Sequence, residues 1–343
     1  MGETYDLASL SQKNQKFRDL LCDFYITFNN PEAAIPLLQA TLDCYPYSIN
    51  HWNSLGKCYL STNDYEEAHE AIDFALAIDD SNAEALTLKA FCYQQSGELQ
   101  KSCDYYLRLA EQQENKTRAY LALAKTYFEM QDYTSSIYYI EALLDNKDAL
   151  SKYELSELYG DIALCHAALK HIGVGQASIR RSLELNENDP DTLIVAGRFF
   201  LMEAKACNDE TAKAENQAKG ELYFRQALNL IMEDERLDYL FTIGAACFDT
   251  QNFKLAAQYY EQINREFPDN APATYFFLAY CYFYLEEAIS CMHYIAKMKH
   301  ELPDAYSNLG TSDSILSDTR FNELMRNLKD SVNNGKVDLD NFL

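Results

Sequence analysis

Histidine and cysteine are the side chains of this sequence whose chemistry suits metal binding, and the six histidines are scattered. They approach cysteines in two groups, Cys165-His166-His171 and Cys291-His293-His300. Neither group has the spacing of a structural zinc site, such as two cysteines separated by two residues. His166 and His171 are five positions apart, which places them on different faces of a helix. We therefore expect no metal site.

Motifs for nucleotide binding and nucleophilic catalysis do not occur in the sequence. It contains no G-x-x-x-x-G-K-[ST], no G-x-G-x-x-G and no G-x-S-x-G. Its many carboxylates are spread as they are on solvated helices, and no pair stands out as an acid and a base. The sequence predicts a protein that is not an enzyme and uses no cofactor.

The chain is strongly acidic, with 53 Asp and Glu against 29 Lys and Arg and a formal net charge of −24. Such a surface repels the phosphates of nucleic acids and anionic lipid headgroups, so we expect neither nucleic acid nor membrane as a partner. Solubility alone accounts for this charge, and attraction of a basic partner is the alternative.

The sequence predicts no targeting signal. The first residues have no apolar stretch of a secretory signal, and Tyr5 and Asp6 fit the myristoylation pattern after Gly2 poorly. No run reaches the roughly 18 apolar residues of a membrane span. The ten cysteines include no Cys-x-x-Cys pair, and many fall inside helical patterns, where they suit buried thiols in a reducing compartment. These features predict a cytoplasmic protein.

The organising motif of the chain is the segment 49–82. Trp52, Leu55, Gly56 and Tyr59 have the spacing W-x2-L-G-x2-Y. Small and branched apolar residues follow at set offsets, at Ala68, Ile72 and Ala75. The segment resembles a tetratricopeptide repeat (TPR), a helix–turn–helix unit of 34 residues. The small residue at the eighth position is expected where the two helices of a repeat come closest.

Copies of this unit divide the chain. Residues 1–14 form a lead-in, and 15–150 contain four regular repeats. Residues 151–303 hold about four irregular repeats with an insertion near 201–219, which we interpret as extended helices around a break near 207–209. Residues 304–343 are expected to form a C-terminal capping helix and tail. The fold that the resemblance implies is all-α, a right-handed α-α superhelix (TPR solenoid) of about eight repeats. In the style of its repeats, the chain is similar to bacterial proteins made almost wholly of TPRs.

The resemblance also implies which residues line the concave groove, because certain first-helix positions face it. Polar and basic residues there are Asn53, Lys57, Arg118, Lys125 and Arg198. Such groups hold carboxylates, so they predict binding of an acidic peptide. Acidic residues at equivalent places offer the alternative that the charges pair across repeats; these are Asp19, Asp23, Glu84, Glu129, Asp191 and Asp238.

Chaperone-binding members of the family hold a carboxyl-terminal tail in a clamp of Lys, Asn and Arg residues. Here the required places are taken by Asp19 and Asp23 in the first repeat, Leu88 in the third and Ala122 in the fourth. The sequence therefore disfavours a chaperone-tail adaptor.

The last third of the predicted groove is aromatic. Its candidate residues are Phe241, Phe248, Phe276, Tyr280, Phe283 and Tyr284. A helix that is apolar on every side must be covered on more than one face. Three explanations remain open: burial by a capping helix at 315–332, an aromatic groove for a peptide or helix, and a dimer interface.

Together these features predict a non-enzymatic protein–protein interaction scaffold that binds a peptide or protein segment in its concave groove. The alternative is a self-associating structural protein whose aromatic C-terminal face forms a homodimer. We expect the function to lie where the chain departs from the regular repeat, at 201–219 and at the aromatic stretch 274–285.

Overall fold

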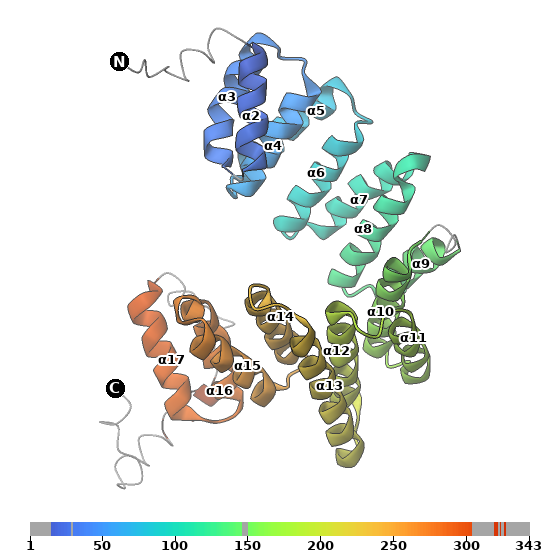
Figure 1. Ribbon diagram of the computed structural model, residues 1–343, viewed down its shortest axis with the longest axis vertical. Coiled ribbons are helices and arrows are strands. Elements are labelled where there is room, and N and C mark those ends of the chain that lie inside the picture. Colours follow the sequence, from blue (N-terminus) through green and yellow to red (C-terminus); the bar gives the residue numbers. More distant parts are fainter. Residues whose placement is uncertain are drawn as a thin grey trace. The chain divides into compact units, whose positions relative to one another are not determined.

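The computed structural model describes residues 15–28, 30–145 and 150–303, together with 319–321, 323 and 326. All regular elements among these residues are helices. The chain divides into two compact units, an N-terminal unit (Met1–Ala149) and a C-terminal unit (Leu150–Leu343). Each unit is a stack of antiparallel helical hairpins (Figure 1). The fold is the all-α TPR solenoid that the repeat pattern predicts.

The N-terminal unit contains α2 (Gln15–Thr27), α3 (Pro31–Cys44), α4 (Ile49–Ser61), α5 (Tyr65–Ile78), α6 (Ala83–Gln95), α7 (Leu99–Ala110), the short 3-10 helix η1 (Gln113–Asn115), α8 (Lys116–Glu129) and α9 (Tyr133–Leu144). The C-terminal unit contains α10 (Lys152–Ala168), α11 (Ile172–Leu185), α12 (Pro190–Ala206), α13 (Glu210–Leu230), α14 (Arg236–Asp249), α15 (Phe253–Glu266), η3 (Pro268–Thr274), α16 (Tyr275–Tyr284) and α17 (Ala288–Glu301).

Six hairpin turns use the same backbone device. One residue in each turn adopts a left-handed conformation with φ between 60° and 77°; these residues are Asn63, Gly97, Gln131, Lys170, Gln251 and Glu286. In the turn of α4 and α5, the backbone N–H of Asp64 then donates to the carbonyl of Tyr59 at 2.9 Å. This bond gives a hydrogen-bond donor to a carbonyl that would lack one at the end of α4. The next helix, α5, begins at the following residue.

A glycine at the eighth position of the repeat allows the two helices of a hairpin to approach closely. A Cβ placed on Gly56 would lie 2.7 Å from Cγ1 of Ile72, and one on Gly244 would lie 2.8 Å from a ring carbon of Tyr260. Real Cβ atoms essentially never make contacts this short, so a larger residue would push the two helices of the hairpin apart. The expected reason for a small residue at this place is confirmed.

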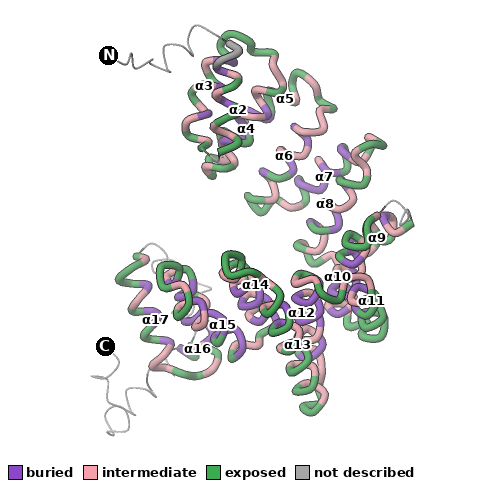
Figure 2. The backbone as a smooth tube through the Cα atoms, in the orientation of Figure 1, coloured by how far each residue is buried: buried purple, intermediate pink, exposed green. Residues whose placement is uncertain are grey.

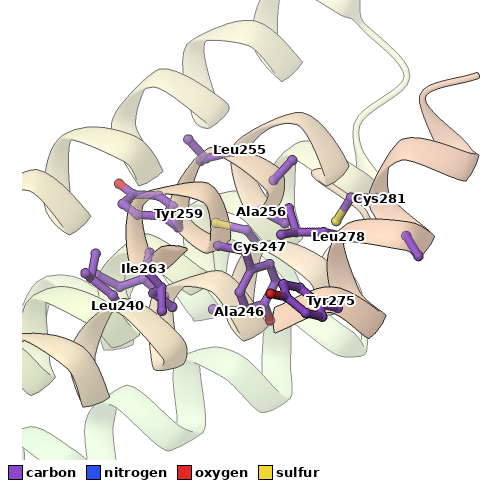
Figure 3. Close-up of a cluster of buried hydrophobic side chains, with 14 of the residues drawn as sticks. Leu240, Ala246, Cys247, Leu255, Ala256, Tyr259, Ile263, Tyr275, Leu278 and Cys281 are labelled. Carbon is purple, nitrogen blue, oxygen red and sulfur yellow. The ribbon is translucent and has the colours of Figure 1, made fainter. Parts of the chain in front are cut away.

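The largest buried cluster lies in the C-terminal unit. It includes Leu240, Cys247, Tyr259 and Ile263 from α14 and α15, and Leu278 from α16 (Figure 3). Figure 2 shows buried positions, in purple, on the sides of the helices that face their neighbours. From α12 to α17, each added hairpin therefore extends one continuous core, as expected for stacked repeats.

The hairpin of α12 and α13 is the longest in the C-terminal unit. α12 continues to Ala206 and α13 begins at Glu210, so residues 201–219 are helical apart from the three at 207–209. The side chain of Asp209 accepts a hydrogen bond from the N–H of Thr211 at 3.1 Å and caps the start of α13. The repeat boundaries and the insertion proposed from the sequence remain an interpretation of these elements.

The predicted capping helix at 315–332 falls largely outside the described residues. Among its described residues, Phe321 is 9% exposed and its ring lies 6.3 Å from that of Phe283. The guanidinium of Arg320 lies 5.3 Å from the same Phe283 ring. This short segment covers the end of α16.

Candidate functional site

The first helices α4 and α6 of the N-terminal unit are joined by a polar network around Glu84. Asn53, which is 1% exposed, donates from Nδ2 to Glu84 Oε2 at 3.0 Å and to Asn82 Oδ1 at 3.1 Å. Lys57 forms an ion pair with the other carboxylate oxygen of Glu84. Burial alone would raise the pKa of Glu84, but the bonds from Lys57 and Asn53 and the charge of Arg118 outweigh it, so the pKa lies below its ordinary value.

Two of the basic residues predicted to line a groove are thus engaged with acids of a neighbouring hairpin. Lys57 pairs with Glu84, and Arg198 on α12 lies 3.6 Å from Asp249 at the end of α14. The other two, Arg118 and Lys125 on α8, are exposed, and neither forms an ion pair with a residue that the structure describes. Pairing across repeats therefore occurs at Lys57 and Arg198.

Aromatic rings meet at a partly exposed surface on α14 and α16 of the C-terminal unit. We call Phe248, Phe276 and Tyr280 the aromatic surface. The rings of Phe276 and Tyr280 are 4.6 Å apart, and that of Phe248 lies 6.3 Å from Tyr280. Phe276 is 38% exposed, and the other two are half-buried. The structure brings these three predicted residues together.

The three other predicted aromatic residues have ring contacts of their own. Phe283 is 5% exposed and belongs to the core beneath Phe321. Tyr284 is 43% exposed and stacks on Phe253 at 4.4 Å. Phe241 packs against the core and lies 6.4 Å from Tyr260.

Burial raises the pKa of several cysteine thiols. Burial raises the pKa of the Cys22 and Cys92 thiols to about 11 and that of Cys281 to about 12. Such thiols stay protonated at neutral pH, which makes them poor nucleophiles and poor metal ligands. In the described part of the chain, no three His, Cys, Asp or Glu residues are grouped to hold a metal ion.

Two pockets lie beside the second helices of the hairpins, away from the predicted groove residues. One, of about 480 Å³, is lined by residues of α3, α4 and α5 that include Trp52 and Phe74. The other, of about 610 Å³, is lined by residues of α11, α12 and α13 that include Leu183 and Tyr223. Trp52 was expected only as part of the repeat pattern. The residue that could have indicated this pocket is Phe74, an aromatic residue beside acidic positions on α5.

None of the described helices is long and apolar enough to cross a membrane. The fold and these surfaces define a helical-repeat protein.

The tetratricopeptide repeat family model matches residues 53–117. A tetratricopeptide repeat protein from Parabacteroides merdae ATCC 43184 shares the fold with a TM-score of 0.59 and 12% identity, over 75% of this chain and 94% of its own. The C-terminal part of a TPR repeat-containing protein from Cytophaga hutchinsonii gives a TM-score of 0.47 and 15% identity, over 72% of this chain and 95% of its own. A MamA protein is 20% identical with a TM-score of 0.45, over 50% of this chain and 92% of its own. No curated protein sequence matches.

The repeat model thus covers residues 53–117, and the Parabacteroides merdae protein shares the helical-repeat fold of this chain.

Proposed function

We propose that this protein binds a segment of another protein across the aromatic surface of Phe248, Phe276 and Tyr280. The observation that carries the proposal is the contact of these three partly exposed rings on α14 and α16. Aromatic side chains offer a large contact area with few rotatable bonds, which is why they dominate the energetics of protein interfaces.

Two of the basic residues predicted to bind a ligand already have acidic partners, which favours the aromatic surface as the binding site. A carboxylate ligand at Lys57 has to compete with Glu84, which already holds both Lys57 and Asn53. At Arg198 it has to compete with Asp249. At the aromatic surface, Phe276 is 38% exposed, and burial of apolar area stabilises the complex by about 25 cal/mol per Å² before the costs of association.

The occupant of the aromatic surface is a peptide segment with apolar side chains spaced to meet neighbouring rings. Phe248 comes from α14, whereas Phe276 and Tyr280 lie four residues apart on α16. Anchors on one face of a partner helix or on alternate residues of a strand match such a layout.

A peptide selection with a matched counter-selection tests the proposal. Peptides selected on the full chain are measured against the Phe276→Ser/Tyr280→Ser variant and against Tyr138→Ser, a control that removes an aromatic residue that is 64% exposed in the N-terminal unit. We expect the double variant to weaken binding by about 100-fold, as for two anchor residues, and the control to leave it unchanged. Equal binding to both variants, with unchanged thermal melting, would contradict the proposal.

Self-association through the same rings is the second candidate, because a partly exposed aromatic surface also suits a dimer. Light scattering across micromolar concentrations separates the two. A monomer at all concentrations removes the dimer. A dimer that dissociates in the Phe276→Ser/Tyr280→Ser variant would replace the peptide-binding proposal.

We further propose that the protein acts without catalysis of its own in the cytoplasm. Support comes from its buried, protonated thiols, which suit a reducing compartment.

A further inference from the structure

The pocket of about 480 Å³ in the N-terminal unit has an apolar floor. Leu42 from α3, Leu55 from α4 and Ala71 from α5 form this floor, and all three are buried. The volume falls in the range of pockets that enclose a small ligand or one long side chain. The pocket therefore offers an apolar site open to solvent on the side of the second helices.

The wall of the pocket is aromatic and fixed in position. The rings of Trp52 and Phe74 stack at 4.6 Å with an angle of 18°. Trp52 Nε1 donates to the carbonyl of Pro46 at 2.8 Å, and the Tyr59 hydroxyl accepts from Gln39 Nε2 at 2.8 Å. Phe74 is nevertheless 52% exposed. The hydrogen bonds hold the rings in place before any ligand binds, which reduces the entropy lost on binding.

The rim of the pocket is acidic. Asp43, Glu67 and Glu70 line it, all three are exposed, and no lysine or arginine does so. None of these carboxylates makes a side-chain hydrogen bond or ion pair with a described residue, unlike Glu84 on the first helices. Three uncompensated negative charges around an aromatic wall favour a cation.

We propose that this pocket receives an arginine side chain from a basic segment of a partner protein. A guanidinium is planar, only weakly hydrated and stacks on aromatic rings, while its aliphatic stem suits the apolar floor. The carboxylates of Asp43, Glu67 and Glu70 provide acceptors for its N–H groups. The net charge of −24 attracts such a segment before contact is made. This site is independent of the aromatic surface in the C-terminal unit.

The test uses Trp52, the single tryptophan of the chain, as the reporter. A tryptophan-free peptide, acetyl-Ala-Leu-Arg-Arg-Leu-Ala-amide, is titrated against the full chain while tryptophan emission is followed. The control peptide carries citrulline in place of arginine, which keeps the shape of the side chain but removes its charge. We expect a saturable change with the arginine peptide, binding about tenfold weaker with citrulline, and further weakening as salt rises.

A pair of charge variants locates the site. Glu67→Gln/Glu70→Gln removes two rim charges, and Glu66→Gln/Asp80→Asn removes two exposed charges of the same repeat that do not line the pocket. We expect the first pair to weaken arginine-peptide binding by about fivefold to tenfold and the second by less than about twofold. Thermal melting by circular dichroism checks that both variants are folded.

Three results would overturn the proposal. One is no saturable change in Trp52 emission up to about 1 mM peptide, the weakest affinity of interest. Another is equal binding of the arginine and citrulline peptides. The third is an equal loss of binding in the two variant pairs, which would show that only the overall charge attracts the peptide.

Discussion

The two units of this protein share one hairpin design and differ in what their first helices present. In the N-terminal unit, α4 and α6 are joined by the polar contacts of Glu84 with Asn53 and Lys57. In the C-terminal unit, α14 and α16 meet through Phe248 and Tyr280. The same backbone thus supports a polar face, where Glu84 holds Lys57 and Asn53, and an aromatic face, where Phe276 stays 38% exposed.

The largest expected effect comes from the core of the C-terminal unit. Phe224 is fully buried and its ring lies edge-on to that of Tyr259 at 6.2 Å. Phe224→Ala removes these contacts and leaves a cavity, so it should lower the free energy of unfolding by about 3–5 kcal/mol. Hydrogen exchange should show the loss in α12–α15.

Trp52 emission provides the control for this prediction, because that residue lies in the N-terminal unit. Its unfolding transition should stay in place in Phe224→Ala. If the Trp52 transition shifted together with the unfolding transition of the C-terminal unit, the two units would unfold as one.

The second prediction concerns a buried carboxylate of the C-terminal unit. Glu203 on α12 is 2% exposed, and its Oε1 is buried without a hydrogen-bond partner among the described residues. Burial raises its pKa, and Gln176 and Lys219 offset this in part. Glu203→Gln keeps the shape without the charge and should stabilise the unit at pH 7 by about 1 kcal/mol.

The pH dependence of this effect follows from the raised pKa. The folded protein holds the proton of Glu203 more tightly than the unfolded chain, so the native state is favoured below the ordinary glutamate pKa. That advantage is lost as pH rises through the raised value. The variant and the wild type should therefore converge in acid. A difference in denaturant midpoint that persists at pH 4 would refute the electrostatic explanation.

The smallest expected effect is a loss of stability in the N-terminal unit, opposite in sign to the effect of Glu203→Gln. The pKa of Glu84 is lowered in the folded state, so its carboxylate stabilises the unit above the ordinary glutamate pKa. This contribution disappears as pH falls through the lowered value. Because 45% of the side chain is exposed, solvent screening limits it, and Glu84→Gln should cost about 0.5–1 kcal/mol at pH 7.

The Trp52 unfolding transition measures the loss at Glu84, and Glu66→Gln on α5 is the matched control for one exposed charge. Stability that is unchanged in Glu84→Gln, or is lowered equally in Glu66→Gln, would show that the network does not stabilise the unit.

The helical hairpins could be predicted from the sequence because the residues that determine them are close together in the chain. Trp52, Leu55, Gly56 and Tyr59 fall within one helix, and the close approach of Gly56 to Ile72 lies within one repeat. The left-handed residues of the turns were not identified, because Gln131 and Gln251 are not types that favour this conformation.

The candidate sites depended on contacts between distant residues, which helical spacing does not encode. Phe283 has the pattern of a groove residue, but it is buried beneath Phe321, nearly forty positions away. Lys57 was considered both as a ligand for carboxylates and as an ion-pair partner; its contact with Glu84 requires the spacing between adjacent repeats. Trp52 and Phe74 were likewise on different helices, so their shared pocket was not recognised.

The packing of each helix mainly on its neighbours in sequence has a consequence for how the chain folds. Within the N-terminal unit, the main contacts join successive helices, and the longest step among them, from α4 to α6, skips only one. Contacts of this kind close short loops and allow rapid folding. Because the N-terminal unit ends at Ala149, its hairpins can acquire their partners during synthesis before α10 leaves the ribosome.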